Sequence, residues 1–181
     1  MSKQFFLGSV VISGIASVLL SLFMMAAAAG GALGLVGFLF FLSLLVTVYL
    51  AVVGAIMWYK AWSSIQDGSA RATPGKAVGF MFIPIFNFYW VFQAIWGFAK
   101  DYNSYIERHQ YSVDKLPEGL FLASTIMAVA GIIAGRIPFL GILYSIACLI
   151  VFALVVAKVC DAVNAISTPA AAGQVEEQSR V

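Results

Sequence analysis

The chain has 181 residues, of which 62% are hydrophobic and only 10% are charged, and its mean hydropathy is +0.99. Soluble domains contain about 25% charged residues, so this composition excludes an ordinary soluble domain and predicts an integral membrane protein. The net charge is +2, and the ten basic residues are spread along the chain. A clustered basic surface for nucleic acid is therefore not expected.

At about 20 residues per spanning helix, the length allows four or five spans and no separate soluble domain. Four apolar stretches predict spans, in chain order, at residues 5–28, 33–59, 116–134 and 138–158. Glycines at 30, 31 and 34 predict a tight turn between the first two, and Gly135 to Pro138 a turn between the last two. Residues 1–166 then form one helical membrane domain, and the polar residues 167–181 predict a disordered tail.

The N-terminal apolar run resembles a signal peptide, because Lys3 precedes it and Ala26–Ala29 offers small residues for cleavage. The run from Phe5 to Met25 covers 21 residues, however, whereas the apolar core of a signal peptide is usually about 7–15 residues long. We therefore expect an uncleaved first span.

The segment 74–99 is apolar and aromatic, yet prolines interrupt it. Thr73 suits an N-cap and Pro74 the first helical position, which predicts a short helix to about Phe82. Pro84 lacks an N–H group and biases Ile83 away from helical angles, so the helix should break there.

After the break, Asn87 is expected to cap a second helix that runs to about His109. Irregular backbone at membrane depth must be covered by protein or line a wet cavity, because lipid offers it no hydrogen bonds. We therefore expect residues 83–87 to pack against the other helices. Pro84, Asn87 and Gln93 are the candidate residues for a functional or structural break.

The distribution of basic residues distinguishes two topologies. If the segment 74–99 crosses the membrane as a fifth span with a proline kink, the two sides hold five basic residues each. If it enters and leaves on one side, nine fall on that side and only Arg136 on the other. Positive charge is concentrated on the cytoplasmic side of membrane proteins. The sequence thus favours an all-α protein of four spans plus a broken re-entrant or interfacial segment, with both termini cytoplasmic, and five spans remain the alternative.

Small residues suggest faces on which helices pack closely. The first predicted span carries a stripe of serines at four-residue spacing, namely Ser9, Ser13, Ser17 and Ser21. Gly131 and Gly135 give a second small-residue pair. Such faces allow close approach of membrane helices, either within the chain or with a second copy or partner protein.

Ionisable residues are absent from the centres of the predicted spans, which argues against a proton- or ion-coupled transporter. No cofactor or metal site is predicted, since His109 is the only histidine. Gly75 and Lys76 at a predicted helix start are a candidate contact for a phosphate or lipid headgroup. Lys158 and Asp161 are expected to pair, with Asn164 capping the last helix.

The block from Ala61 to Glu107 contains TPGKAVGFMFIPIFNFYWVFQAIWGFAKDYN. It resembles a family of bacterial multi-pass membrane proteins of unassigned function that share a TPGKAVGF-x-FIP-x-FN-x-YW pattern, and the ending VCDAVN at residues 159–164 is similar too. The resemblance implies a location in the bacterial cytoplasmic membrane. It supplies no catalytic residue and no substrate.

Three functional hypotheses follow. The first is a non-enzymatic accessory or assembly subunit that packs through small-residue helix faces. The second is a channel or carrier for a neutral or lipidic solute, with the break at Pro84–Asn87 at its site. An enzyme acting on lipid is the weakest, because the acidic residues and His109 have no convincing catalytic partner.

Overall fold

A computed structural model describes residues 1–134 and 140–167 of the chain, and every regular element in this part is helical. In order they are α1 (Lys3–Ala29), α2 (Leu33–Ser63), α3 (Pro74–Gly79), η1 (Phe80–Phe82), α4 (Pro84–Val91), η2 (Phe92–Trp96), α5 (Gly97–Arg108), α6 (Glu118–Ala134) and α7 (Leu140–Ile166). The expected all-α class is thus confirmed for the described residues.

Three helices, α1, α2 and α7, are long and apolar enough to cross a membrane, and α6 is a shorter apolar helix of 17 residues. The last long helix continues to Ile166, eight residues past the predicted end of the span. The predicted turn at 135–138 and the tail from 168 onward lie outside the described residues.

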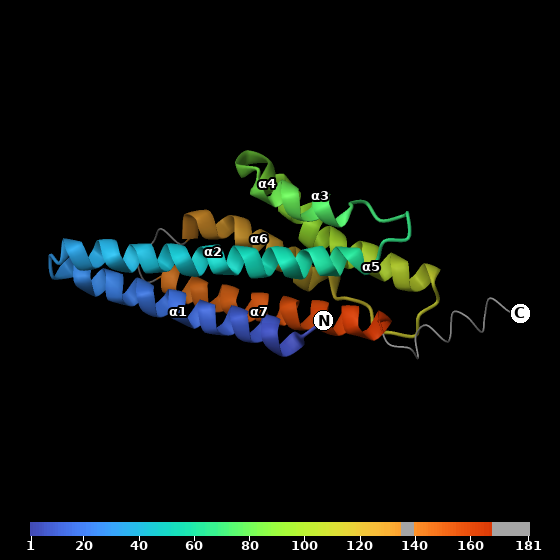
Figure 1. Cartoon of the computed structure of the whole chain (residues 1–181), viewed down its shortest axis with the longest axis horizontal. Coiled ribbons are helices and arrows are strands. Elements are labelled where there is room, and N and C mark those ends of the chain that lie inside the picture. The colour runs from blue at the N-terminus through green and yellow to red at the C-terminus, as the bar shows by residue number, and fades with distance from the viewer. Residues whose placement is uncertain (135–139, 168–181) are drawn as a thin grey trace, which may run out of the picture.

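The axes of the three long helices, α1, α2 and α7, are nearly aligned (Figure 1). α1 and α2 form an antiparallel pair whose turn contains Gly31 at φ 72°, a backbone angle that glycine adopts without strain. α7 packs on α1, and α6 packs on α7. The turn between α1 and α2 is at one end of the molecule, whereas Met1 and the ends of α5 and α7 lie at the other (Figure 1).

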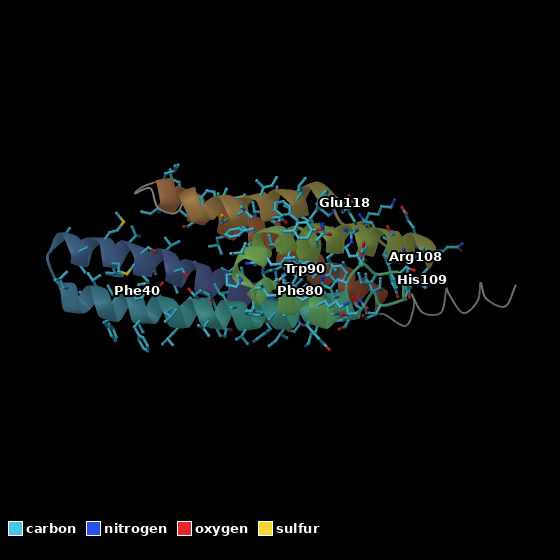
Figure 2. All side chains as sticks on the ribbon, turned by 90° about the horizontal axis from the view of Figure 1, so that it is seen from above. Phe40, Phe80, Trp90, Arg108, His109 and Glu118 are labelled. Atoms are coloured by element: carbon cyan, nitrogen blue, oxygen red, sulfur yellow. The ribbon has the colours of Figure 1, made fainter. Side chains whose placement is uncertain are left out.

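Between α2 and α5 the chain makes a short hairpin. α3 and η1 run out, the chain turns at Ile83, and α4 runs back before continuing through the π-helical turn η2 into α5 (Figure 1). The Trp90 indole N–H donates to the carbonyl of Ala77 at 3.0 Å, and the rings of Phe80 and Trp90 lie 4.8 Å apart. These contacts hold the two arms together; both residues are labelled in Figure 2.

The local signals for the hairpin are confirmed in part. Thr73 caps α3 through its hydroxyl and Pro74 occupies the first turn, as expected. Ile83 is extended, with ψ 110°, because it precedes Pro84. The prediction for Asn87 is wrong: the second helix already begins at Pro84, since proline suits the first helical turn, and Asn87 lies inside α4.

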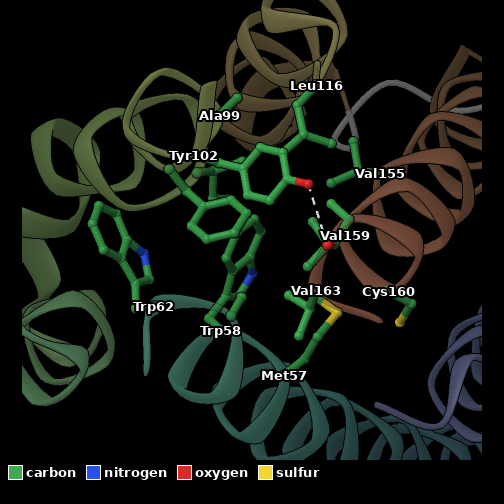
Figure 3. Packing of buried hydrophobic residues seen from close by; sticks show 14 of the residues in the cluster. Met57, Trp58, Trp62, Ala99, Tyr102, Leu116, Val155, Val159, Cys160 and Val163 are labelled. Atoms are coloured by element: carbon green, nitrogen blue, oxygen red, sulfur yellow. Dashed lines mark hydrogen bonds between the residues drawn. The ribbon is translucent and has the colours of Figure 1, made fainter. Parts of the chain in front are cut away.

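The tightest packing surrounds α5. Phe98 contacts Trp58 and Trp62 of α2 edge-on, with ring centres 5.6 Å apart in each pair. The Tyr102 hydroxyl donates to the carbonyl of Ala162 in α7 at 3.2 Å, and the Trp62 indole donates to Ala94 in η2 at 3.0 Å. Figure 3 shows the rings of α2 and the valines of α7 on either side of Tyr102. This core fixes η2 and α5 between α2, α6 and α7.

The start of α1 is tied to the end of α7. The amino group of Met1 donates to the Asn164 side chain, and the Asn164 amide donates back to the carbonyl of Met1 at 2.9 Å. Lys3 pairs with Asp161 at 2.7 Å. Two predictions are therefore wrong, because Asp161 takes its cation from α1 instead of Lys158 and Asn164 binds Met1 instead of capping α7.

Candidate functional site

The tip of the hairpin, where the sequence placed a candidate site, is exposed. Ile85 is 87% exposed, Ile83 47% and Phe86 38%, and Pro84 is exposed as well. The expectation that residues 83–87 pack against the other helices is wrong. The arms extend the tip beyond the surface of α2 and α6, so only the neighbouring arm covers it (Figure 1).

Asn87 is half-buried within α4, where its N–H donates to the carbonyl of Ile83 at 2.8 Å. Gln93 belongs to a different group of polar side chains. Its amide donates to the Tyr89 hydroxyl at 3.1 Å, and its carbonyl accepts from Arg71 at 3.4 Å. The structure therefore does not bring Asn87 and Gln93 together.

Arg71 is the centre of that group. Its backbone N–H and its Nε donate to the two carboxylate oxygens of Asp101 at 2.9 and 2.8 Å, and its Nη2 lies 2.6 Å from Asp101 Oδ1. The contact joins the loop before α3 to α5. It therefore fixes the base of the hairpin on the core.

A second ion pair closes the same loop. Asp67 accepts from Arg108 at 2.7 Å and from the N–H of Ser69 at 2.9 Å, and His109 lies 3.3 Å away. The Arg108 guanidinium, followed by the Ser69 N–H, lowers the pKa of Asp67 from 3.8 to about 2. The interaction is structural, since it holds residues 64–73 against the end of α5.

The candidate headgroup residues Gly75 and Lys76 are exposed on α3. The N–H of Lys76 is already engaged by the Thr73 hydroxyl at 3.4 Å. A helix of six residues also has a small dipole, so the geometry adds nothing to the phosphate contact that the sequence suggested.

The predicted serine stripe faces the inside of the molecule, but its members differ. Ser9 and Ser13 are buried, and the Ser9 hydroxyl is 2.9 Å from the hydroxyl of Tyr49 on α2. Ser17 and Ser21 donate to carbonyls of their own helix, both at 2.8 Å. Ser9 thus forms a hydrogen bond across helices, whereas the bonds that Ser17 and Ser21 donate stay within α1.

The glycine pair is described only at Gly131, because Gly135 lies outside the described residues. A Cβ atom on Gly131 would be 3.2 Å from the Tyr144 ring, whose hydroxyl donates to Met127. A second close approach, which the sequence analysis did not single out, brings Leu149 of α7 over Gly14 of α1. Both small-residue faces are therefore used for contacts within the chain.

A cavity of about 640 Å³, open on one side, lies between α1, α2, α6 and α7. It is lined by Phe6, Val10, Gly14, Ser17, Val18, Ser21, Thr47, Leu50, Ala51, Val53, Gly54, Met57, Ser124, Met127, Ala128, Gly131, Tyr144, Ser145, Cys148, Leu149, Val151, Phe152 and Val156. Neither Asn87 nor Gln93 contributes to it. The second hypothesis placed its site at the Pro84–Asn87 break, which does not line this cavity.

The wall of this cavity is apolar and uncharged. Five serine and threonine hydroxyls line it, and each donates to a carbonyl of its own helix: Ser17, Ser21, Thr47, Ser124 and Ser145. The Tyr144 hydroxyl is likewise engaged. A guest would meet methyl, methylene and aromatic groups, with hydroxyl oxygens able only to accept.

Sequence reasoning found Ser17, Ser21 and Gly131, but as packing residues. The other lining positions come from four helices, and no local pattern distinguishes them from residues that face lipid. Cys148 shows the difficulty: it lines the cavity as a free thiol, whereas the free thiol of Cys160 is buried in the core.

These features define the class of the protein. It is a helical protein with three helices long and apolar enough to cross a membrane, and with an apolar cavity between them. No family model, no curated protein and no solved structure matches the chain.

Proposed function

We propose that the protein is a non-enzymatic integral membrane protein that holds an uncharged, apolar molecule between its helices, as a carrier or binding protein for a lipidic solute. The observation that carries this proposal is the cavity of about 640 Å³. Ligand pockets in proteins usually measure about 300–1,000 Å³ and have mostly apolar walls. The residues that line it include no Asp, Glu, Lys, Arg or His; their titratable groups are the phenol of Tyr144, whose hydroxyl donates to Met127, and the free thiol of Cys148.

Selection of such a guest rests on shape. Lipid tails are as apolar as the cavity wall, so transfer from the bilayer brings no hydrophobic gain. Dispersion contacts are lost wherever a wall faces empty space, and a guest that fills the space restores them. The proposed ligand is therefore a molecule that fits the cavity closely.

The proposed topology has four spans, with α6 as the fourth, in the bacterial cytoplasmic membrane and with both termini on the cytoplasmic side. At 1.5 Å per α-helical and 2.0 Å per 3₁₀ residue, α3 and η1 reach about 15 Å, or half of a hydrocarbon core of about 30 Å. An arm of this length supports a re-entrant or interfacial hairpin. Arg108 and His109 lie at the end of the molecule opposite Phe40 (Figure 2), which agrees with the distribution of basic residues.

Single cysteines at positions 68 and 110, in a chain without Cys148 and Cys160, test the topology. Both should react with an impermeant thiol reagent from the cytoplasmic side only. Reaction of position 68 from one side and position 110 from the other would require a fifth span. The position of the cavity relative to the two faces of the membrane would then have to be reassigned.

A variant whose new side chain fills the cavity tests the proposed binding of a lipidic molecule. A Cβ on Gly54 would meet nothing within 4 Å, and Gly54 lines the cavity, so Gly54→Leu places a side chain in the empty space. Gly37→Leu is the matched control, because Gly37 also lies on α2, has the same free space and is outside the lining. We expect native mass spectrometry to detect bound lipid on the wild type and Gly37→Leu but at least tenfold less on Gly54→Leu. Equal retention by all three contradicts the proposal.

A second candidate is the accessory or assembly subunit. The observation in its favour is the exposed apolar tip of the hairpin, where Phe82, Ile85 and Phe88 are 62%, 87% and 49% exposed. A partner protein or second copy would then bind at the tip, since the small-residue faces are used within the chain. Chemical cross-linking in native membranes should yield a discrete complex that Ile85→Ser weakens and Gly54→Leu does not.

A further inference from the structure

We infer that the cavity holds one extended hydrocarbon chain of a membrane lipid, which enters between α2 and α6 with its methyl end towards Phe6, Met57 and Val156. This inference rests on the proposed function and adds the class of ligand, its route and its direction. The length of the cavity, the burial of one end, the exposure of lining residues away from that end and the state of the hydroxyl groups support it.

The cavity is elongated along the helix axes. Its lining follows α1 from Phe6 to Ser21, which at 1.5 Å per residue is about 22 Å along the helices. A space of this form suits a single extended chain better than a compact ring system or a hydrated solute.

One end of the cavity is closed. Phe6, Met57 and Val156 line it there, and they are 3%, 2% and 0% exposed. They belong to the same buried cluster as Trp58, Phe98 and Tyr102, so packed side chains stand behind them. A chain that reached this end would terminate against apolar groups.

The opposite part of the cavity is open to the side. Thr47 and Ala51 of α2 and Ala128 of α6 line it and are exposed, as are Ser21 and Ser145, whose helices α1 and α7 pack on each other. α2 packs on α1 and α3, whereas α6 packs on α7 and η2, and the segment η2–α5 lies between α2 and α6 (Figure 2). The side chains at the edges are small, so the opening between α2 and α6 admits a chain without displacement of a large residue.

The polar groups of the wall indicate which part of the lipid stays outside. The lining hydroxyls donate to backbone carbonyls, within their own helix for the serines and the threonine and to Met127 of α6 for Tyr144, and no lining residue carries a charge. A phosphate or a carboxylate inside would lose its hydration without gaining a donor. The headgroup therefore remains outside the opening, and the hydrocarbon chain alone enters.

Photoactivatable lipids in nanodiscs test the direction. A phospholipid with a diazirine at the methyl end of its acyl chain is expected to label the closed end, at Phe6, Met57 and Val156. The same lipid with the diazirine near the ester should label Thr47, Ala51 and Ala128. Peptide mapping by mass spectrometry reads the sites, and a fatty acid with a terminal diazirine shows whether a free chain suffices.

A variant with a narrowed opening tests the route. Ala51→Phe places a ring at the opening, and Val52→Phe is its control because Val52 is 53% exposed next to it but does not line the cavity. We expect at least a fivefold loss of labelling at the closed end in Ala51→Phe and none in Val52→Phe.

The outcomes separate the inference from the proposed function. Labels in reversed order, or labelling that Ala51→Phe leaves unchanged, overturn the direction or the route while lipid binding stands. Labelling by the fatty acid but not by the phospholipid assigns the site to a free chain and overturns the lipid as its source. Absence of labels on any lining residue, together with equal lipid retention by Gly54→Leu, overturns both.

Discussion

Two groups of aromatic residues on the continuous helical run from Pro84 to Arg108 have opposite surroundings. Phe88 and Tyr89 are 49% and 59% exposed, whereas Phe98 and Tyr102 are 0% exposed. The groups are ten residues apart and have similar composition. The difference therefore comes from what surrounds the helix and not from the residues themselves.

The surroundings differ because α5 lies among α2, α6 and α7, while α4 extends past them. The buried group, Phe98 and Tyr102, belongs to a core in which the side chains of other helices must fit closely around each ring. The exposed group meets only its neighbouring arm and whatever lies around the molecule. Five predictions test this contrast and the contacts that produce it, from the largest expected effect to the smallest.

Truncation of Phe98 should have the largest effect. Phe98→Ala leaves a cavity between Trp58 and Trp62 and should cost about 3–5 kcal/mol of unfolding free energy. Phe88→Ala should change it by less than about 0.5 kcal/mol, because an exposed side chain leaves no void. Unfolding in mixed micelles with increasing SDS measures both. Equal losses would show that the tip is packed as tightly as the core.

Removal of the charge of Asp101 should have the next largest effect. Asp101→Asn weakens the bonds from Arg71 and should cost about 1.5–3 kcal/mol, since bonds to a charged group are strong when little water reaches them. Asp161→Asn is the control: its pair with Lys3 is exposed and should cost less than about 1 kcal/mol. The same SDS titration compares them, and a larger loss for Asp161→Asn would reverse the expected ranking.

Substitution of Trp90 should lower the stability of the hairpin and leave that of the core unchanged. Trp90→Phe removes the bond to Ala77 and should cost the hairpin about 1 kcal/mol. Hydrogen exchange should then accelerate about fivefold at residues 74–91 and remain unchanged in α5. Phe88→Leu, at a position of α4 that is 49% exposed, serves as the control. Accelerated exchange in α5 as well would mean that the hairpin and the core unfold together.

The serine stripe should show a smaller difference between its members. Ser9→Ala loses the bond to Tyr49 and should cost about 0.6 kcal/mol, the average for such bonds between membrane helices. Ser17→Ala loses only a bond to its own helix and should be close to neutral. Thermal unfolding in detergent compares the two. An effect of Ser17→Ala above that of Ser9→Ala would point to a partner for Ser17 outside its helix.

The smallest effect concerns the loop at residues 64–73. The pKa of Asp67 is lowered from 3.8 to about 2, so its contacts with Arg108 and Ser69 stabilise the folded loop above about pH 4 and are lost as the pH falls towards 2. Hydrogen exchange of the loop should accelerate over that range. In Asp67→Asn the exchange should be fast at pH 5 already and show no such step. A step that persists in the variant would assign the transition to another carboxylate.

The amino-acid pattern was sufficient to predict the helices and the break in the hairpin. Thr73, Pro74 and Pro84 act within a few residues of themselves, through missing N–H groups and a cap, so their effects are visible in the sequence. The pattern was not sufficient for the environment of residues 83–87. Burial depends on which other elements reach the same place, and neighbouring residues do not encode that directly.

The cavity could not be predicted for the same reason. Gly54 and Gly37 look alike in the sequence, as apolar-run glycines of one helix, yet only Gly54 faces the cavity. Likewise Asp161 had a local candidate partner in Lys158, but the structure gave it Lys3, 158 residues away. Contacts over such distances follow from how α1 and α7 pack.

The sequence by itself determined a helical, membrane-like chain with a proline break, because hydropathy, proline geometry and capping act locally. The tertiary structure alone decided that the serines face inward, that one aromatic group is covered and the other exposed, and that α2 and α6 are held apart by η2 and α5. The physical reason is that close packing is a property of surfaces from several helices, and an empty space exists only where none of them fills it.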